Sequence, residues 1–418
     1  MAELYDNEIK PSRMLLIGVE TDGFLDFKES LDELKELCKT SGGEVAGVIT
    51  QKRDTLHSGT CVGEGKIEEI KEFAEENDID TIVFDLELSP AQLKNIENAL
   101  SGFEVIDRTM LILNIFSQNA KTAEGKIQVE LAKLQYSLPR LKGSYQGLSR
   151  IGGGIGTRRG AGESKLELDK RYISKRILQL KSEIKEIQKR RNDLRQRRKK
   201  DDVISIAIAG YTNSGKSTLL NALTDAGVLA QDKLFATLDP TSRALKLPDG
   251  RNVLVIDTVG FIRRLPHHMI EAFKSTLEEV VYADLVLLVC DVSNLNLDSQ
   301  LTVTRDLLKE LKYSGPILTA YNKSDKIKKK VKKETETDVY ISALNSTGLD
   351  KLLLKIQNSL TEKTVTVKFL IPYNKYEILN FLSESSKILT QTHLATGTEI
   401  KAIVLEKIAK KYAAYLVK

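Results

Sequence analysis

Cysteine is scarce in this sequence, and its few copies are poorly placed for a metal site or a disulfide framework. The three cysteines, Cys38, Cys61 and Cys290, are far apart, odd in number and without the spacing of zinc ligands. Long apolar runs are also missing, since none reaches the ~18 residues that a membrane-spanning helix needs. The polar, acidic N-terminus does not resemble a signal peptide. These absences predict a protein of a reducing cytoplasm with no membrane partner.

The length and charge of the chain give two further expectations. At 418 residues the chain exceeds one ordinary hydrophobic core, so two to four domains are expected. Residues 171–200 contain thirteen Lys or Arg and three Asp or Glu, a net charge of +10, whereas the whole chain carries only +5. A segment this basic indicates a polyanionic partner, with a solvated helix face as the alternative.

Residues 1–120 are typical of a small α/β domain. Aliphatic or β-branched runs at 14–20, 44–50, 81–88 and 103–108 predict strands, and the segments between them predict helices. One helix is expected to start with Ser89 as its N-cap and Pro90 in its first turn. The alternation favours a parallel sheet flanked by helices. The glycine-containing stretch 57–66 is either a phosphate contact or a loop before a helix.

Residues 121–200 predict a long antiparallel helical hairpin. Apolar residues recur at helical spacing in both arms: Ile127, Leu131, Leu134 and Leu138 in the first, and Ile173, Ile177, Leu180, Ile184, Ile187 and Leu194 in the second. The stretch 138–164 is rich in Gly and Arg and too long for a tight turn. We expect four of its arginines to contact RNA phosphates: Arg140, Arg150, Arg158 and Arg159.

Residues 201–362 predict a domain built on a parallel sheet, because five strand-like runs are apolar on both faces. The stretch GYTNSGKS follows the first of these runs and opens a helix, which is the setting of a phosphate-binding loop. Lys216 is expected to reach the β- and γ-phosphate oxygens, and the Ser217 hydroxyl to ligate Mg²⁺. The predicted contacts in this loop are Gly210, Tyr211, Thr212, Asn213, Ser214, Gly215, Lys216, Ser217 and Thr218.

Two short motifs after later strands select guanine over adenine. The carboxylate of Asp325 can accept hydrogen bonds from N1–H and the 2-amino group of guanine, a pair that adenine lacks. A backbone amide after the next strand can bind guanine O6. GTP and GDP are therefore the expected nucleotides. The predicted base contacts are Asn322, Lys323, Asp325, Ser342, Ala343 and Leu344.

Other residues are expected to sense the γ-phosphate. Asp257 ends a strand, so its carboxylate can hold the magnesium shell through water, and the Gly260 amide can meet the γ-phosphate. Thr237 is expected to cap Mg²⁺ when GTP is bound, with Thr241 as the alternative, and Phe235 is included among the nucleotide contacts. We assign catalytic roles to Lys216, Thr237, Asp257 and Gly260, and metal ligation to Ser217 and Thr237.

Hydrolysis by the isolated protein is expected to be slow. Phe261 occupies the place where Ras-like enzymes have a glutamine that orients the attacking water, and a phenyl ring cannot do this. Asn213 has two interpretations: it holds a potassium ion (K⁺) beside the phosphates, or it simply tolerates the loop conformation.

Several stretches together resemble the HflX family of GTPases. They are VIDRTMLILNIFSQNAKTAEGKIQVELAKLQYSLPRL, GGGIGTRRGAGESKLELDKR, GYTNSGKSTLLNAL, FATLDPTSR and DTVGFIRRLPHHMIEAFKSTLEE. The resemblance covers roughly residues 14–360 and, more loosely, the C-terminal residues. The family commonly has Gly-Pro-Gly-Glu-Thr where this chain has Gly160-Ala-Gly162-Glu163-Ser164, a difference that concerns the stiffness of the loop.

The resemblance implies a fold and a partner. The expected fold class is α/β: a P-loop GTPase domain with a parallel sheet (201–362), preceded by a small α/β domain (1–120) plus a long helical hairpin (121–200), and followed by a small α+β C-terminal domain (363–418). It also implies binding to the large ribosomal subunit and its rRNA, GTP hydrolysis stimulated by ribosomes, and dissociation of stalled or stressed ribosomes. We expect a monomer with no DNA partner.

Two other interpretations fit the residues. One is a GTPase switch that acts on a protein or tRNA-modification partner, with the hairpin as its docking arm. The other is a scaffold that binds GTP without turnover, against which Lys216, Ser217 and Asp257 argue because all three are present.

Overall fold

The structure is a computed structural model that describes most of the chain. The described residues are 11–22, 26–141, 159–200, 203–224, 234–235, 241–263, 277–294, 296–327, 334–360 and 364–417. The chain divides into two compact units. Unit 1 comprises residues 1–190, 233–238 and 263–274, and unit 2 comprises residues 191–232, 239–262 and 275–418. None of the helices in these described ranges is long and apolar enough to cross a membrane.

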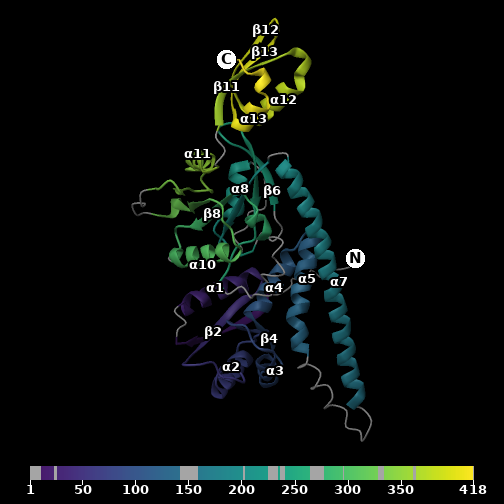
Figure 1. Cartoon of the computed structure of the whole chain (residues 1–418). Coiled ribbons are helices and arrows are strands. Elements are labelled where there is room, and N and C mark those ends of the chain that lie inside the picture. Colours follow the sequence, from purple (N-terminus) through teal and green to yellow (C-terminus); the bar gives the residue numbers. More distant parts are fainter. Residues whose placement is uncertain are drawn as a thin grey trace, which may run out of the picture. The chain divides into compact units, whose positions relative to one another are not determined.

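Unit 1 contains a four-stranded parallel sheet in the order β2-β1-β3-β4, drawn in purple and blue in Figure 1. Its strands are β1 (Arg13–Thr21), β2 (Glu44–Arg53), β3 (Thr81–Phe84) and β4 (Glu104–Asp107). Helices α1 (Phe27–Thr40), α2 (Glu64–Glu76) and α3 (Pro90–Ala99) connect them. The predicted alternation of strands and helices is confirmed, although β3 ends four residues earlier than its apolar run.

Helix α3 begins as the sequence predicts. The Ser89 hydroxyl accepts a hydrogen bond from the Gln92 amide at 3.2 Å, and the Gln92 side chain accepts one from the Ser89 amide at 3.0 Å. These reciprocal bonds satisfy two amides that the helix itself leaves unpaired, and Pro90 needs no such bond.

Helix α4 (Arg108–Asn119) is absent from the predicted helices. Its buried residues lie on one side of the helix, whereas Ser117 and Gln118 are exposed on the other. Asp107 supplies the N-cap, since its Oδ1 accepts from the Met110 amide at 2.8 Å. The buried apolar side chains of α4 are Leu111, Ile112, Leu113, Ile115 and Phe116.

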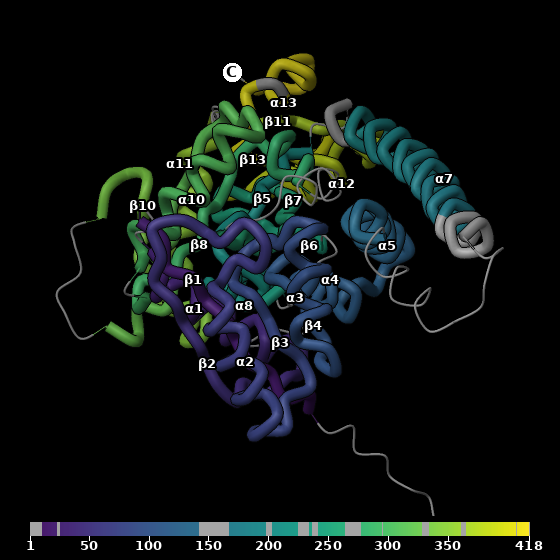
Figure 2. Tube along the Cα trace, turned by 90° about the horizontal axis from the view of Figure 1, so that it is seen from below, coloured from purple at the N-terminus to yellow at the C-terminus, as the bar shows by residue number. Residues whose placement is uncertain are grey.

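The predicted helical hairpin is present as α5 (Ala123–Ser137) and α7 (Arg159–Lys200), which run side by side in Figures 1 and 2. In unit 1 their apolar seam is centred on Leu131, Ile177 and Leu180. Arg176 adds a bidentate ion pair to Glu130, with N–O distances of 2.7 and 2.8 Å. The seam does not reach the end of the predicted repeat. Leu194 is 50% exposed.

Unit 2 contains a six-stranded sheet in the order β10-β9-β8-β5-β7-β6. Five strands are parallel: β5 (Ile204–Gly210), β7 (Asn252–Asp257), β8 (Leu285–Asp291), β9 (Ile317–Asn322) and β10 (Asp338–Tyr340). The predicted buried parallel sheet is therefore confirmed, but it has an additional antiparallel edge strand, β6 (Thr241–Lys246). Helices α8 (Lys216–Thr224), α10 (Leu297–Glu310) and α11 (Leu349–Ser359) belong to the same domain.

The C-terminal residues form the expected α+β domain, which belongs to unit 2. Its antiparallel sheet has the order β11-β13-β12, with β11 at Thr364–Ile371, β12 at Lys387–Leu394 and β13 at Gly397–Leu405. Helices α12 (Tyr376–Ser385) and α13 (Glu406–Lys411) cover one face of this sheet. The division into four domains at 120, 200 and 362 stays a prediction.

Candidate nucleotide-binding site

The loop between β5 and α8 has backbone conformations that only glycine adopts easily. Gly210 has φ of 153°, and a Cβ at this residue would lie 2.1 Å from the carbonyl oxygen of Val289. Gly215 has φ of 91°, and a Cβ there would lie 2.3 Å from Nδ2 of Asn322. Both glycines therefore allow the loop to pack directly on the ends of β8 and β9. Asn213 takes the left-handed conformation, with φ of 58°.

Lys216 lies beneath this loop, where the sequence predicts it. Its side chain is buried and its Nζ donates a hydrogen bond to the carbonyl oxygen of Tyr211 at 2.8 Å. Burial lowers the pKa of Lys216 to about 8, and the nearby carboxylate of Asp257 opposes that shift. A Cβ at Gly260 would lie 3.0 Å from Nζ, so the chain after β7 approaches the same ammonium group. A polyphosphate beside this lysine would favour its charged form.

The two residues expected around magnesium are brought together. The hydroxyl of Ser217 donates a hydrogen bond to Oδ2 of Asp257 at 2.7 Å, and Asp257 is fully buried. The neighbouring Thr258 hydroxyl donates to the carbonyl oxygen of Ile208 at 2.7 Å, which fixes the end of β7 against β5. A hydroxyl and a carboxylate at this spacing fit Mg²⁺, which prefers oxygen ligands and retains several waters.

Other hydroxyls of the loop also fit a ligand rich in hydrogen-bond acceptors. Thr212 Oγ1 and Ser214 Oγ are buried and have no hydrogen-bond partner among the described residues. Phe261 joins this loop through its backbone: its amide donates to the Gly210 carbonyl oxygen at 3.0 Å, and its own carbonyl oxygen accepts from the Thr212 amide at 2.8 Å. Phe261 is buried, so its ring stabilises the loop and orients no water.

The predicted base-binding residues also hold the phosphate loop. Asn322 Nδ2 donates to the carbonyl oxygen of Ser214 at 2.9 Å. Lys323 Nζ donates to the carbonyl oxygen of Asn213 at 2.9 Å and forms an ion pair of 2.8 Å with Oδ2 of Asp291. Sequence reasoning missed Asp291. Its only sequence signal is its place at the end of β8, beside the strand that ends in Asn322, because parallel strands present their C-terminal ends at the same edge.

The chain after β10 orients Asp325, the carboxylate that is predicted to select guanine. The Ser342 hydroxyl donates to Oδ1 of Asp325 at 2.5 Å. The Ser342 amide donates within its own loop, and the Ala343 amide donates to Oδ1 of Asn322 at 2.9 Å. Which backbone amide of Ser342, Ala343 and Leu344 binds guanine O6 therefore stays a prediction.

Thr237, with Thr241 as the alternative, is the residue predicted to cap Mg²⁺ when GTP is bound. Thr237 lies outside the described residues. Thr241, the alternative, is the first residue of β6 and pairs with Asp257 in the sheet, so it lies in the ladder beside the magnesium-site carboxylate. Thr218 is in the first turn of α8, directly after Ser217.

Phe235, which is predicted to contact the nucleotide, packs within unit 1, and its nucleotide contact stays a prediction. Its ring packs edge-to-face on Phe116, with 4.6 Å between ring centroids, and its carbonyl oxygen accepts from Asn119 Nδ2 at 2.9 Å. All three residues belong to unit 1. The aromatic pair explains the burial of Phe235 as packing, because its exposed fraction is only 3%.

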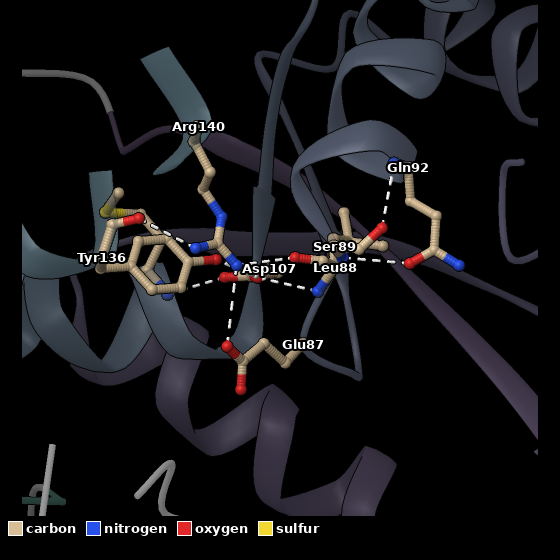
Figure 3. A network of polar contacts seen from close by, with 8 residues as sticks. Glu87, Leu88, Ser89, Gln92, Asp107, Tyr136 and Arg140 are labelled. Carbon is tan, nitrogen blue, oxygen red and sulfur yellow. Dashed lines mark hydrogen bonds and ion pairs between the residues drawn. The ribbon is translucent and has the colours of Figure 1, made fainter. Parts of the chain in front are cut away.

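Arg140, which is predicted to contact RNA, makes the contacts within unit 1 that Figure 3 shows, and its RNA contact stays a prediction. Its guanidinium lies 3.4 Å from the centroid of the Tyr136 ring and donates to the carbonyl oxygens of Tyr136 at 2.9 Å and Leu88 at 2.6 Å. The Tyr136 hydroxyl donates to the carboxylate of the buried Asp107. With 11% of its side chain exposed, Arg140 is a structural residue at the end of α5.

The structure adds little on the other three predicted RNA contacts. Arg150 and Arg158 lie outside the described residues. Arg159 is the first residue of α7, and nothing is described of its side chain.

Three known families match consecutive parts of the chain. The GTP-binding GTPase N-terminal family matches residues 28–117, the GTP-binding GTPase Middle Region matches 119–198, and the 50S ribosome-binding GTPase family matches 205–323. Together these matches span most of the sequence.

Similar proteins from several bacteria bear the name GTPase HflX. The relative from Caldanaerobacter subterraneus is 48% identical over 93% of this chain and 91% of its own length. The relative from Escherichia coli is 41% identical over 80% of this chain and 79% of its own length. Among solved structures, a GTP-binding protein from the archaeon Sulfolobus solfataricus in complex with GDP is 28% identical, with 84% of this chain and 99% of that chain covered and a TM-score of 0.45.

Proposed function

The chain belongs to the HflX family of GTPases and therefore binds and hydrolyses GTP, and we propose that it does so on the large ribosomal subunit, where it dissociates or rescues stalled ribosomes. The 50S ribosome-binding GTPase family that matches residues 205–323 supports this partner by its description. In this proposal the protein acts as a cytoplasmic monomer and contacts rRNA.

The observation that carries the proposal is the exposed positive charge of α7. Basic side chains point into solvent along more than seven turns of this helix, whereas its apolar seam faces α5. Regular positive charge on a rigid helix suits the phosphate backbone of structured RNA. The exposed basic residues are Arg171, Lys175, Lys181, Lys185, Lys189, Arg190 and Arg197.

The site supports hydrolysis through positioning and charge. Lys216 and the Gly260 amide bind the γ-phosphate, while Ser217 and Asp257 hold Mg²⁺. Mg²⁺ held by Ser217 and Asp257 would supply positive charge beside the phosphates. Phe261 cannot orient the attacking water, so hydrolysis is slow until contact with the ribosomal subunit completes the site. Phosphate release then weakens ribosome binding.

The test is GTP turnover by the purified chain alone, with large subunits and with small subunits, and with ATP as the control substrate. Turnover that rises at least tenfold with large subunits, for GTP only, supports the proposal. Equal turnover under all conditions contradicts the ribosomal part and leaves a GTPase whose partner is a protein or a tRNA-modification factor.

A charge-reversal pair tests whether α7 is the RNA-binding surface. The variant replaces three exposed lysines of α7 by Glu, and the control replaces three exposed lysines of other helices: Lys181, Lys185 and Lys189 against Lys71, Lys309 and Lys351. The first variant should bind large subunits more weakly. Its plot of log affinity against log salt concentration should also be shallower, with a slope reduced by about 0.7–0.9 for each lost phosphate contact. Equal binding by both variants would exclude α7 as the contact surface.

We further propose that K⁺ assists hydrolysis through Asn213. The Asn213 side chain is exposed while its backbone is held by Lys323, so the amide oxygen is free to ligate an ion beside the phosphates. Turnover should then fall when KCl is replaced by NaCl, and Asn213→Ala should remove this difference. Equal rates in both salts would reject the role.

A further inference from the structure

The turn that joins β6 to β7 is polar but buried. Asp249 and Arg251 have exposed fractions of only 5% and 4%, which is unusual for charged residues of a hairpin turn. They form an ion pair of 2.7 Å with each other, and Arg251 Nη2 donates to the carbonyl oxygen of Gln357 in α11 at 3.0 Å. The turn is thus a built contact surface and not a free loop.

The partner of this turn is the C-terminal domain within unit 2. Gly250 has φ of 89°, and a Cβ there would lie 2.2 Å from the amide nitrogen of Lys387, the first residue of β12. Asn252 Nδ2 donates to the carbonyl oxygen of Glu384, near the end of α12, at 2.7 Å. We call the contact made by residues 249–252 the seat.

The other end of the same hairpin is the magnesium site. Thr241 at the start of β6 pairs with Asp257 at the end of β7, and Asp257 is bonded to Ser217. The six residue pairs between these ends run without a bulge. At ~3.4 Å per residue the ladder is about 20 Å long. One continuous two-stranded element therefore joins the residues that contact Mg²⁺ to the seat.

The seat leaves hydrogen-bonding capacity unused. Arg251 Nη1, Gln357 Oε1 and Ser386 Oγ are buried there and have no hydrogen-bond partner among the described residues. Buried polar groups in folded proteins are normally paired, so these three atoms have capacity for new hydrogen bonds when the contact shifts. The seat is a close contact in which some hydrogen-bonding groups are unpaired, and a contact of this kind can switch between two packing arrangements.

We propose that the β6–β7 hairpin couples the position of the C-terminal domain to the bound nucleotide. A γ-phosphate pulls on the residues around Asp257 and Gly260, and the bulge-free ladder transmits this movement to the seat, where Gly250 leaves no room for sliding without displacement of Lys387. Coupling of this kind is reciprocal, so the seated domain also changes the relative affinity for GTP and GDP. The inference needs only nucleotide binding and is independent of the ribosomal partner.

The position of the domain can be measured by pulsed electron-electron spin resonance on the full chain. Spin labels at Gln391→Cys in β12 and Lys309→Cys in α10 report the distance between the C-terminal domain and the nucleotide domain. Both positions are exposed. The native cysteines are buried and leave the labels specific. The distance distribution should differ between the GDP complex and the complex with a non-hydrolysable GTP analogue and Mg²⁺. Identical distributions would overturn the proposal.

A matched pair of glycine variants distinguishes the effect of disturbing the seat from the effect of backbone strain at a glycine with positive φ. Gly250→Ala adds a methyl group that collides with β12, whereas Gly42→Ala adds one to a glycine of the same φ, 89°, with no atom within 4 Å. Asn252→Leu removes the bond to α12 without altering the turn. The nucleotide-dependent shift should survive in Gly42→Ala and disappear in the two seat variants.

The affinity ratio provides an independent readout. In the Gly250→Ala chain the ratio of the dissociation constants for the GTP analogue and GDP should change by about fivefold or more, the lower end of typical coupling. Gly42→Ala should leave this ratio unchanged. A seat variant that keeps both the distance shift and the native ratio would show that the hairpin does not couple the two sites, whatever the ribosome assay gives.

Discussion

The hydroxyl of Ser342 donates a hydrogen bond of 2.5 Å to Oδ1 of Asp325, so a residue after β10 orients the carboxylate that follows β9. A carboxylate oxygen can accept more than one hydrogen bond, which leaves both oxygens able to receive the N1–H and 2-amino groups of guanine. The bond fixes the carboxylate before the nucleotide arrives, and such preorganisation favours both affinity and specificity.

Asp325→Asn should therefore change which nucleotide binds. Loss of two bonds to a charged acceptor should weaken GTP and GDP by on the order of 100-fold. The new amide can donate to the 2-carbonyl of xanthine, so XTP should gain affinity. Ser342→Ala keeps the carboxylate and should cost only about tenfold. Titration with fluorescent nucleotides measures both, and an unchanged GTP-to-XTP preference in Asp325→Asn would contradict the assignment.

Asp291→Asn should weaken GTP and GDP to the same extent, by about tenfold. Asp291 holds Lys323 Nζ at 2.8 Å while that nitrogen bonds the phosphate loop, and the two side chains are 15% and 20% exposed. A partly buried ion pair has a larger effect than a surface pair. The control is Asp306→Asn, whose ion pair with Lys309 is largely exposed and should not matter. A loss confined to GTP would show that Asp291 acts on the γ-phosphate instead.

The parts of this protein that sequence reasoning identified are those with a local signal. The phosphate loop carries its glycines and Lys216 within eight residues, and the hairpin carries an apolar residue every three or four positions. Ser89 and Pro90 mark the start of α3 because a helix N-terminus needs acceptors for its free amides. Each of these patterns reflects the physics of one short segment.

The remaining features depend on distant parts of the chain. Helix α4 packs against α1, α5, β3 and β4, so its burial depends on elements elsewhere in the chain. Arg140 looks like a phosphate ligand in a Gly/Arg-rich stretch, yet Tyr136 and Leu88 bind it. Asp291 acquires its role from Lys323, which lies on the next strand. No local pattern can encode such pairings.

The three thiols should react slowly with alkylating reagents in the native protein. Burial raises the pKa of Cys38 and Cys290 to about 12 and that of Cys61 to about 11. The thiolate is the reactive form, so at pH 8 its population at Cys38 and Cys290 falls about a thousandfold below that of a thiol with pKa 9.0. Labelling should rise as the pH approaches 10.

Mass spectrometry of iodoacetamide-treated protein checks this expectation. In denaturant all three cysteines should react at the same rapid rate, which supplies the control. Rapid modification of one cysteine at pH 8 in the native protein would show that its site opens more readily than its burial implies.

The network at the end of α5 should stabilise unit 1 without affecting nucleotide binding. Asp107 accepts hydrogen bonds from the amides of Leu88 and Met110 and from the Tyr136 hydroxyl. Burial and the neighbouring Asp107 carboxylate raise the pKa of Tyr136, so its hydroxyl stays protonated and remains a donor. Asp107→Ala leaves three donors without their acceptor and should lower the free energy of unfolding by about 3 kcal/mol.

Tyr136→Phe is the milder variant, because it removes one donor and keeps the ring on which Arg140 stacks. Tyr136→Phe should lower the free energy of unfolding by about 1 kcal/mol. Denaturant unfolding of both variants measures these differences, and GDP affinity should stay native because the network and the phosphate loop lie in different units. If Asp107→Ala cost no more than Tyr136→Phe, the cap of α4 and the bond to Leu88 would contribute little. The hairpin would then be held mainly by its apolar seam and by the ion pair between Arg176 and Glu130.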